Sequence, residues 1–134
     1  MTIHKLLPAA FALGALILTM PALAAHDAPV RGEAKLAKIL AGRTAGQPIR
    51  CLDTTQRRNM EVVDRTAMVF KDGDTYYVNR PAGVRFLTWS DVPVFRVWGS
   101  QVCSKDLVHL RDTATWMQGA TMVMGEFVPY RRNG

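Results

Sequence analysis

The sequence predicts a mainly β domain, at the margin of α+β: a small antiparallel sandwich or open barrel of about six or seven strands with one short N-terminal helix. Two observations carry this prediction. Asp72-Gly73 lies between two β-prone runs, a strong hairpin signature because glycine accepts the positive φ of a tight turn. Further short β-branched or apolar runs, separated by Gly and Pro turn signals, then follow along the chain.

Apolar residues at helical spacing between Glu33 and Gly42 predict the helix, and Gly42 stands where a glycine would end it. Residues 26–32, which include Pro29 and Gly32, are expected to be a flexible tail ahead of a single domain over residues 33–134.

The remaining runs predict the strands. They are residues 49–52, 60–64, 66–71 paired antiparallel with 74–79, 94–98, 106–111 and 120–128. Residues 106–111 alternate cleanly, with Val108 and Leu110 on one face. Gly125 interrupts the last run and indicates a bulge or a close backbone contact.

Residues 1–25 have the layout of a secretory signal peptide, with Lys5 as the positive region and an apolar stretch over residues 6–20. An A-x-A cleavage site, Ala22 to Ala25, follows Pro21. We therefore expect a periplasmic or secreted mature chain in an oxidising compartment. An uncleaved anchor is the alternative, because the apolar run approaches the roughly 20 residues of a membrane span.

Cys51 and Cys103 are the only cysteines. In an exported chain an even count indicates a disulfide, and two cysteines allow one connectivity. Closing a loop of about 50 residues would stabilise the domain by roughly 4 kcal/mol in the chain-entropy model. The alternatives are a redox site, which usually has Cys-x-x-Cys spacing that is absent here, and a thiol nucleophile, which needs a base beside it.

The chain has 17 Lys and Arg against 11 Asp and Glu, a net charge of +6. These bases are scattered and form no run of five like charges, so nucleic acid is not expected as a partner. An anionic envelope component or another protein is the expected partner, since envelope polymers and lipid head groups are the anions outside the cytoplasm. A solvated surface of mixed sign explains the scatter equally simply.

Several segments, taken in chain order, carry a resemblance. They are Cys51-Leu52, Val62-Val63-Asp64-Arg65-Thr66, Tyr76-Tyr77-Val78-Asn79, Cys103-Ser104-Lys105-Asp106 and Gly125-Glu126-Phe127-Val128-Pro129. Over roughly residues 46–130 the chain is similar to an uncharacterised domain-of-unknown-function family of small secreted proteobacterial proteins. Members often carry two further cysteines, near Gly83 and Thr121, that are missing here. The resemblance implies a Cys51–Cys103 bond and brings no activity, cofactor or catalytic residue.

The sequence offers few side chains suited to general acid–base catalysis. A small periplasmic, hydrolase-like enzyme could use His109 with Asp106 or Ser104. However, residues at odd spacing in a strand project to opposite faces, so His109 and Asp106 should not meet. No G-x-S-x-G elbow supports Ser104 as a nucleophile. His109 therefore remains a candidate against an ordinary half-buried strand histidine, and no catalytic residue is assigned.

Metal chemistry has one candidate at the mature N-terminus. If cleavage follows Ala25, the amine and imidazole of His26 could together hold copper, with His109 as a third ligand. A mobile tail is the alternative. No EF-hand loop, zinc spacing, phosphate loop or dinucleotide fingerprint is present, so no metal and no cofactor is expected.

Aromatic residues gather in the least regular part of the chain: Phe86, Trp89, Phe95, Trp98 and Trp116. On a rigid β scaffold, exposed Trp89, Trp98 and Trp116 would form a ligand surface for a sugar or a peptide, because aromatic residues often anchor interfaces. Core packing is the alternative, because a small domain must bury most of its aromatic residues.

The leading hypothesis is a noncatalytic exported β-rich protein that acts in binding or as an accessory of the envelope. The alternatives are the small enzyme built on His109 and association with a membrane surface through Arg side chains. Membrane association of this kind would weaken with salt.

Cleavage after residue 24 or 25 is the testable consequence of the leader. Mass spectrometry of the exported protein should find a mature chain that starts at Ala25 or His26. A full-length chain recovered from the membrane fraction would instead identify an uncleaved anchor.

Overall fold

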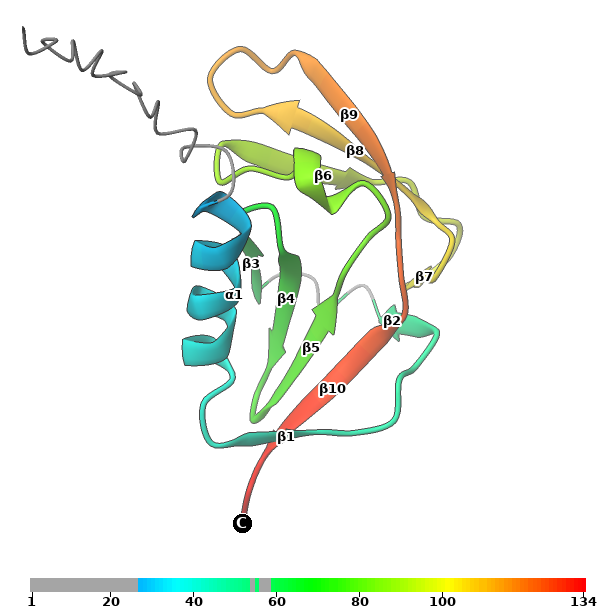
Figure 1. Cartoon of the computed structure of the whole chain (residues 1–134). Coiled ribbons are helices and arrows are strands. Elements are labelled where there is room, and N and C mark those ends of the chain that lie inside the picture. The colour runs from blue at the N-terminus through cyan, green and yellow to red at the C-terminus, as the bar shows by residue number, and fades with distance from the viewer. Residues whose placement is uncertain (1–26, 54, 56–58) are drawn as a thin grey trace, which may run out of the picture.

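The structure is a computed structural model that describes residues 27–53, 55 and 59–134 (Figure 1). The domain is mainly β, as predicted, with one α-helix and three antiparallel sheets in the described residues, none closed into a barrel. The elements are α1 Asp27–Ile39, β1 Arg43–Ala45, β2 Cys51–Asp53, β3 Met60–Val63, β4 Ala67–Asp72, β5 Thr75–Asn79, the 3-10 helix η2 Val84–Phe86, β6 Asp91–Phe95, β7 Gln101–Cys103, β8 Leu107–Asp112, β9 Gln118–Val123 and β10 Phe127–Arg132.

The described residues form ten strands, more than the six or seven expected. Two of the additional strands, β1 and β7, have only three residues each, too few for a period of two to show. The third arises because the run expected over residues 120–128 is divided between β9 and β10, whereas β2 overlaps the strand expected over residues 49–52.

The predicted tail over residues 26–32 is wrong from residue 27 on, because α1 begins at Asp27. Pro29 lies in the first turn, where its missing N–H would have had no helical partner. Gly32 is buried where α1 comes closest to the β3–β4 turn, and a Cβ there would lie 1.9 Å from Thr66 Oγ1. Gly42, with a φ of 72°, follows the end of the helix as predicted.

The five-stranded sheet has the order β1–β10–β5–β4–β3. Its β4–β5 hairpin confirms the prediction from the Asp-Gly signal, but the turn lies one residue later, over Gly73-Asp74. Asp72 pairs with Thr75 in the observed register. Gly73 takes a φ of 54°, which is the conformation for which glycine is favoured.

Side chains of the five-stranded sheet alternate between two apolar layers. On one face Val63, Val69 and Val78 pack with Leu36 of α1. The other face meets the remaining sheets in a larger cluster of Leu52, Met68, Phe70, Leu87, Val102, Val108, Leu110, Met122, Met124 and Phe127. Figure 1 shows α1 beside β3 and β4, with the β6–β8–β9 sheet lying across their upper end.

The disulfide joins β2 to β7, which form the two-stranded sheet. Cys51 lies directly opposite Cys103 in the antiparallel register, with their Cα atoms 4.0 Å apart. The sequence prediction of this bond is therefore confirmed. The bond ties the segment before β3 to the segment between β6 and β8.

The run over residues 120–128 is not one strand, because the chain changes sheet in its middle. Strand β9 belongs to the three-stranded sheet β6–β8–β9, whereas β10 belongs to the five-stranded sheet. Gly125 makes the predicted close backbone contact, since a Cβ there would lie 2.8 Å from the Arg80 carbonyl oxygen. The fully buried Asn79 side chain bonds to the backbone of Gly125 at this crossing.

Gly32→Ala should destabilise the domain although alanine is the better helix former, because the new methyl collides with the β3–β4 turn. We expect a net loss of about 1–3 kcal/mol in the free energy of unfolding, measured by chemical denaturation.

The control is Ala34→Gly, at an exposed position of the same helix, which should lose only about 1 kcal/mol through helix propensity. A Gly32→Ala variant more stable than the native chain would contradict the close approach of α1 to Thr66.

Candidate functional site

The three tryptophans are on the surface. Their exposed fractions are 81% for Trp89, 99% for Trp98 and 58% for Trp116. Core packing, the alternative weighed from the sequence, is therefore wrong for all three. It holds for Phe95, which packs against the core with its ring centroid 6.2 Å from that of Phe70.

The tryptophans do not form one surface. Strand β6 begins where β8 ends, with Asp91 opposite Asp112, so Trp89 and Trp116 lie at the same end of the three-stranded sheet. A backbone hydrogen bond from Thr113 N–H to Ser90 O joins their two loops, at 2.9 Å. Trp98 follows β6 and therefore lies at the opposite end.

The loop that carries Trp116 is held by hydrogen bonds. The Asp112 carboxylate accepts from the backbone N–H and the hydroxyl of Thr115, and these bonds lower the pKa of Asp112. Arg111 donates to the Trp116 carbonyl at 3.2 Å. Trp116 has a φ of 57°, a conformation that costs a non-glycine residue about 1–2 kcal/mol.

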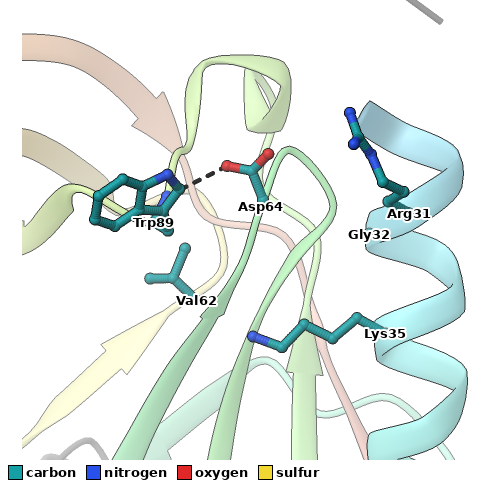
Figure 2. Close-up of a pocket in the computed structure, with 6 residues that line it drawn as sticks. All are labelled: Arg31, Gly32, Lys35, Val62, Asp64 and Trp89. Atoms are coloured by element: carbon teal, nitrogen blue, oxygen red, sulfur yellow. Dashed lines mark hydrogen bonds between the residues drawn. The ribbon is translucent and has the colours of Figure 1, made fainter. Parts of the chain in front are cut away.

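Trp89 forms one wall of a recess of about 380 Å³ between α1 and β3. The recess, called the Trp89 recess below, is lined by Arg31, Gly32, Lys35, Val62, Asp64 and Trp89. Figure 2 shows Arg31 and Lys35 coming from α1 on one side, the Trp89 indole on the other, and Asp64 between them. Its volume falls within the roughly 300–1,000 Å³ of ligand pockets.

Gly32 shapes the Trp89 recess, because the absence of a side chain there lets α1 approach the β3–β4 turn. Arg31 and Lys35 lie four residues apart and therefore share one stripe of the helix, beside the buried stripe of Gly32 and Leu36. The close packing of α1 against the β3–β4 turn therefore also places Arg31 and Lys35 at the recess.

The charges of the Trp89 recess are unevenly paired. Lys35 bonds to Glu61 at 2.9 Å, and Lys71 bonds to the other oxygen of the same carboxylate at 2.6 Å. Asp64 accepts from the backbone N–H of Trp89 at 3.2 Å, which positions the loop that carries the indole. Arg31 makes no hydrogen bond or ion pair with any residue whose side chain is described. Its guanidinium therefore has five N–H donors to offer a ligand.

The enzyme hypothesis needed His109 near Asp106 or Ser104, and the described structure does not join them. His109 Nδ1 lies 2.9 Å from Thr121 Oγ1. The Asp106 carboxylate instead accepts from the backbone N–H of Cys103 at 2.7 Å and so holds the β7–β8 turn. Ser104 lines a different recess, near Gly125.

Within the described residues, no group of three or more His, Cys, Asp and Glu is placed to hold a metal ion. The copper hypothesis depends on His26, which lies outside these residues. None of the helices in the described part of the chain is both long enough and apolar enough to span a membrane.

Sequence reasoning missed Arg31, Lys35 and Asp64 as site residues. Arg31 lay in the segment interpreted as a tail, and Lys35 lay on the polar side of the expected helix. A helix that begins at Asp27 places both on one stripe, so a correct helix start was the signal that could have found them.

Glu61→Gln should make the protein less stable at neutral pH, and the difference should vanish in acid. Hydrogen bonds from Lys71 and then Lys35 hold the pKa of Glu61 below its ordinary value of 4.5. A lowered pKa stabilises the fold above the unfolded-state pKa, and that stability is lost as the pH falls through the folded-state value.

We expect a loss of about 1 kcal/mol or less at pH 7, because the network is partly exposed. Thermal denaturation at several values between about pH 7 and pH 3 measures the loss. Glu126→Gln, which removes an exposed carboxylate outside this network, is the control. If Glu61→Gln were less stable than the native protein by the same amount at every pH, the Glu61 carboxylate would be ruled out as the cause of the difference.

No family model, no curated protein and no solved structure matches the chain. The resemblance to a family of small secreted proteins therefore stays a prediction.

Proposed function

We propose that this protein is an exported, noncatalytic binding protein that holds an anionic saccharide of the cell envelope in the Trp89 recess. The observation that carries the proposal is an indole that is 81% exposed, across one recess from a guanidinium with no partner among the described side chains. A folded domain normally buries a tryptophan, so one left in solvent at a recess is available for a ligand.

The compartment follows from the leader and the cysteines. The signal-peptide pattern of residues 1–25 directs the chain out of the cytoplasm, and the Cys51–Cys103 bond suits an oxidising compartment. The periplasm is the compartment that we propose. Its polymers present sugar rings together with anionic groups.

The chemistry of the Trp89 recess suits such a sugar. The flat indole of Trp89 offers a face on which a sugar ring can stack, and Arg31 can bind a carboxylate through two parallel hydrogen bonds. Lys35 adds positive charge at the same wall while Glu61 holds it in place. Asp64 can accept hydrogen bonds from sugar hydroxyls with the oxygen that does not bind Trp89 N–H.

The positions of the tryptophans favour a local site over a membrane surface. A protein that lies on a bilayer presents its aromatic side chains on one side, toward the interface. Here Trp98 lies at the opposite end of the three-stranded sheet from Trp89 and Trp116. The three indoles are therefore not gathered at one end of the sheet, as a single membrane anchor would require.

The test is co-sedimentation of the mature protein with purified peptidoglycan sacculi. The native protein should pellet with the sacculi, and Trp89→Ala should weaken binding about ten-fold or more, as expected for an aromatic anchor. Arg31→Gln should weaken binding and reduce its dependence on salt, because the variant loses one charge contact.

Matched controls are Trp98→Ala, the most exposed tryptophan at the far end of the sheet, and Arg132→Gln on β10. Both should bind like the native protein, with folding checked by circular dichroism. Equal losses in Trp98→Ala and Trp89→Ala would overturn the site. Retention by anionic vesicles but not by sacculi would replace the proposal with membrane association.

A further inference from the structure

The outer face of the three-stranded sheet carries a second recess, which the proposed function does not use. Strand β8 alternates so that Val108 and Leu110 enter the core while His109 and Arg111 face away from it. Val94 of β6 is the cross-strand partner of His109. These side chains, together with those of Arg96 and Gln118, line a recess of about 90 Å³, called the His109 recess below.

Positive charge in the His109 recess is not compensated. None of the residues that line it is acidic. Arg96 makes no hydrogen bond or ion pair with a described side chain, and Arg111 uses one nitrogen on the Trp116 carbonyl. The carboxylates of the same sheet and its turns each accept from backbone N–H groups of their own turns: Asp91, Asp106 and Asp112.

His109 adds a directed donor. Its Nδ1 pairs with the Thr121 hydroxyl at 2.9 Å, which leaves Nε2 available to a ligand. When the hydroxyl donates to Nδ1, the neutral imidazole carries its hydrogen on Nε2 and can donate from there. The hydrogen bond to Thr121 also restrains the ring, so the donor is positioned before a ligand arrives.

The donors sit on a hydrogen-bonded sheet. Strand β8 pairs with β6 on one side and with β9 on the other, where the register shifts between His109 and Arg111. Arg96 directly follows β6, His109 and Arg111 lie on β8, and Gln118 begins β9. Side chains from three adjacent strands therefore surround one small space, and binding needs little ordering of the backbone.

We propose that the His109 recess binds a phosphate group. Its volume of about 90 Å³ is well below the roughly 300–1,000 Å³ of pockets for larger ligands, which suits a compact oxyanion. Guanidinium groups bind phosphate through paired N–H donors, and donors that approach from three strands match its tetrahedral oxygens better than a flat carboxylate. The group can be inorganic phosphate or the terminal phosphate of an ester.

The test is an NMR titration of the native protein with sodium phosphate, with sodium chloride adjusted to keep the ionic strength constant. The imidazole resonances of His109, assigned by their loss in His109→Gln, should shift along a saturable curve. Arg96→Gln should weaken binding about ten-fold or more, because it removes a charged donor that has no described structural role.

The control is Arg132→Gln, which removes the same charge from β10 and should leave the phosphate affinity unchanged. Separate titrations with glycerol 3-phosphate and with acetate distinguish the sources and the chemistry. Saturable binding of phosphate alone assigns the free ion, and binding of both phosphates assigns the group. Equal response to acetate, a linear response without saturation, or an equal loss in Arg132→Gln would overturn the proposal.

Phosphate binding at the His109 recess does not depend on saccharide binding at the Trp89 recess, so each can be disproved without the other. Trp89→Ala should leave phosphate binding intact, and Arg96→Gln should leave sacculus binding intact, because the recesses share no lining residue. Loss of phosphate binding in Trp89→Ala would show that the two recesses are one site.

Discussion

The arrangement of the sheets depends on one buried contact, where the Asn79 carboxamide meets the backbone of Gly125. Its oxygen accepts from Gly125 N–H at 3.1 Å, and its nitrogen donates to Gly125 O at 2.8 Å. The contact joins points 46 residues apart and fixes where the chain leaves β9 and enters β10. Strand β10 then pairs with β5 on one side and β1 on the other, so both neighbours take their register from this junction. If the buried backbone N–H or C=O of Gly125 lost its hydrogen-bond partner, the free energy of unfolding would fall by about 1–3 kcal/mol.

Local chemistry was enough to predict part of the fold. The Asp-Gly turn predicted the hairpin because that signal lies in two adjacent residues. The disulfide was predictable although its cysteines lie 52 residues apart, because two cysteines behind a signal-peptide pattern allow only one connectivity. The start of α1 was not predictable, since Pro29 and Gly32 are typical of a tail. Gly32 is required by Thr66, a partner far along the chain, and no local pattern reveals such a contact. Trp89 was a candidate from its residue type alone, but the residues that line the recess with it escaped for the same reason, because they meet only where α1 approaches β3.

The fold shows which of the chain's basic side chains have acidic partners and which do not. In the sequence, Arg and Lys residues are scattered among carboxylates at a net charge of +6. In the fold, turn carboxylates such as Asp106 and Asp112 are engaged by nearby backbone N–H groups. Glu61 bonds to two lysines. Arg31 and Arg96 remain without such partners among the described side chains, and each lines a recess. Arg50 and Lys105 also lack such partners and line the recess near Gly125, so the neighbouring Trp89 and His109 are what distinguish the two proposed sites.

The interior position of β10 in the five-stranded sheet affects the order in which the strands can pair during folding. Residues 127–132 lie between β5 and β1, so the edge of β5 stays open until they have left the ribosome. Most of the five-stranded sheet can be synthesised while its pairing is still incomplete. The sheet is complete only when residues distant in the sequence, such as Arg43 and Arg132, have paired, and long-range strand pairing of this kind makes folding slow.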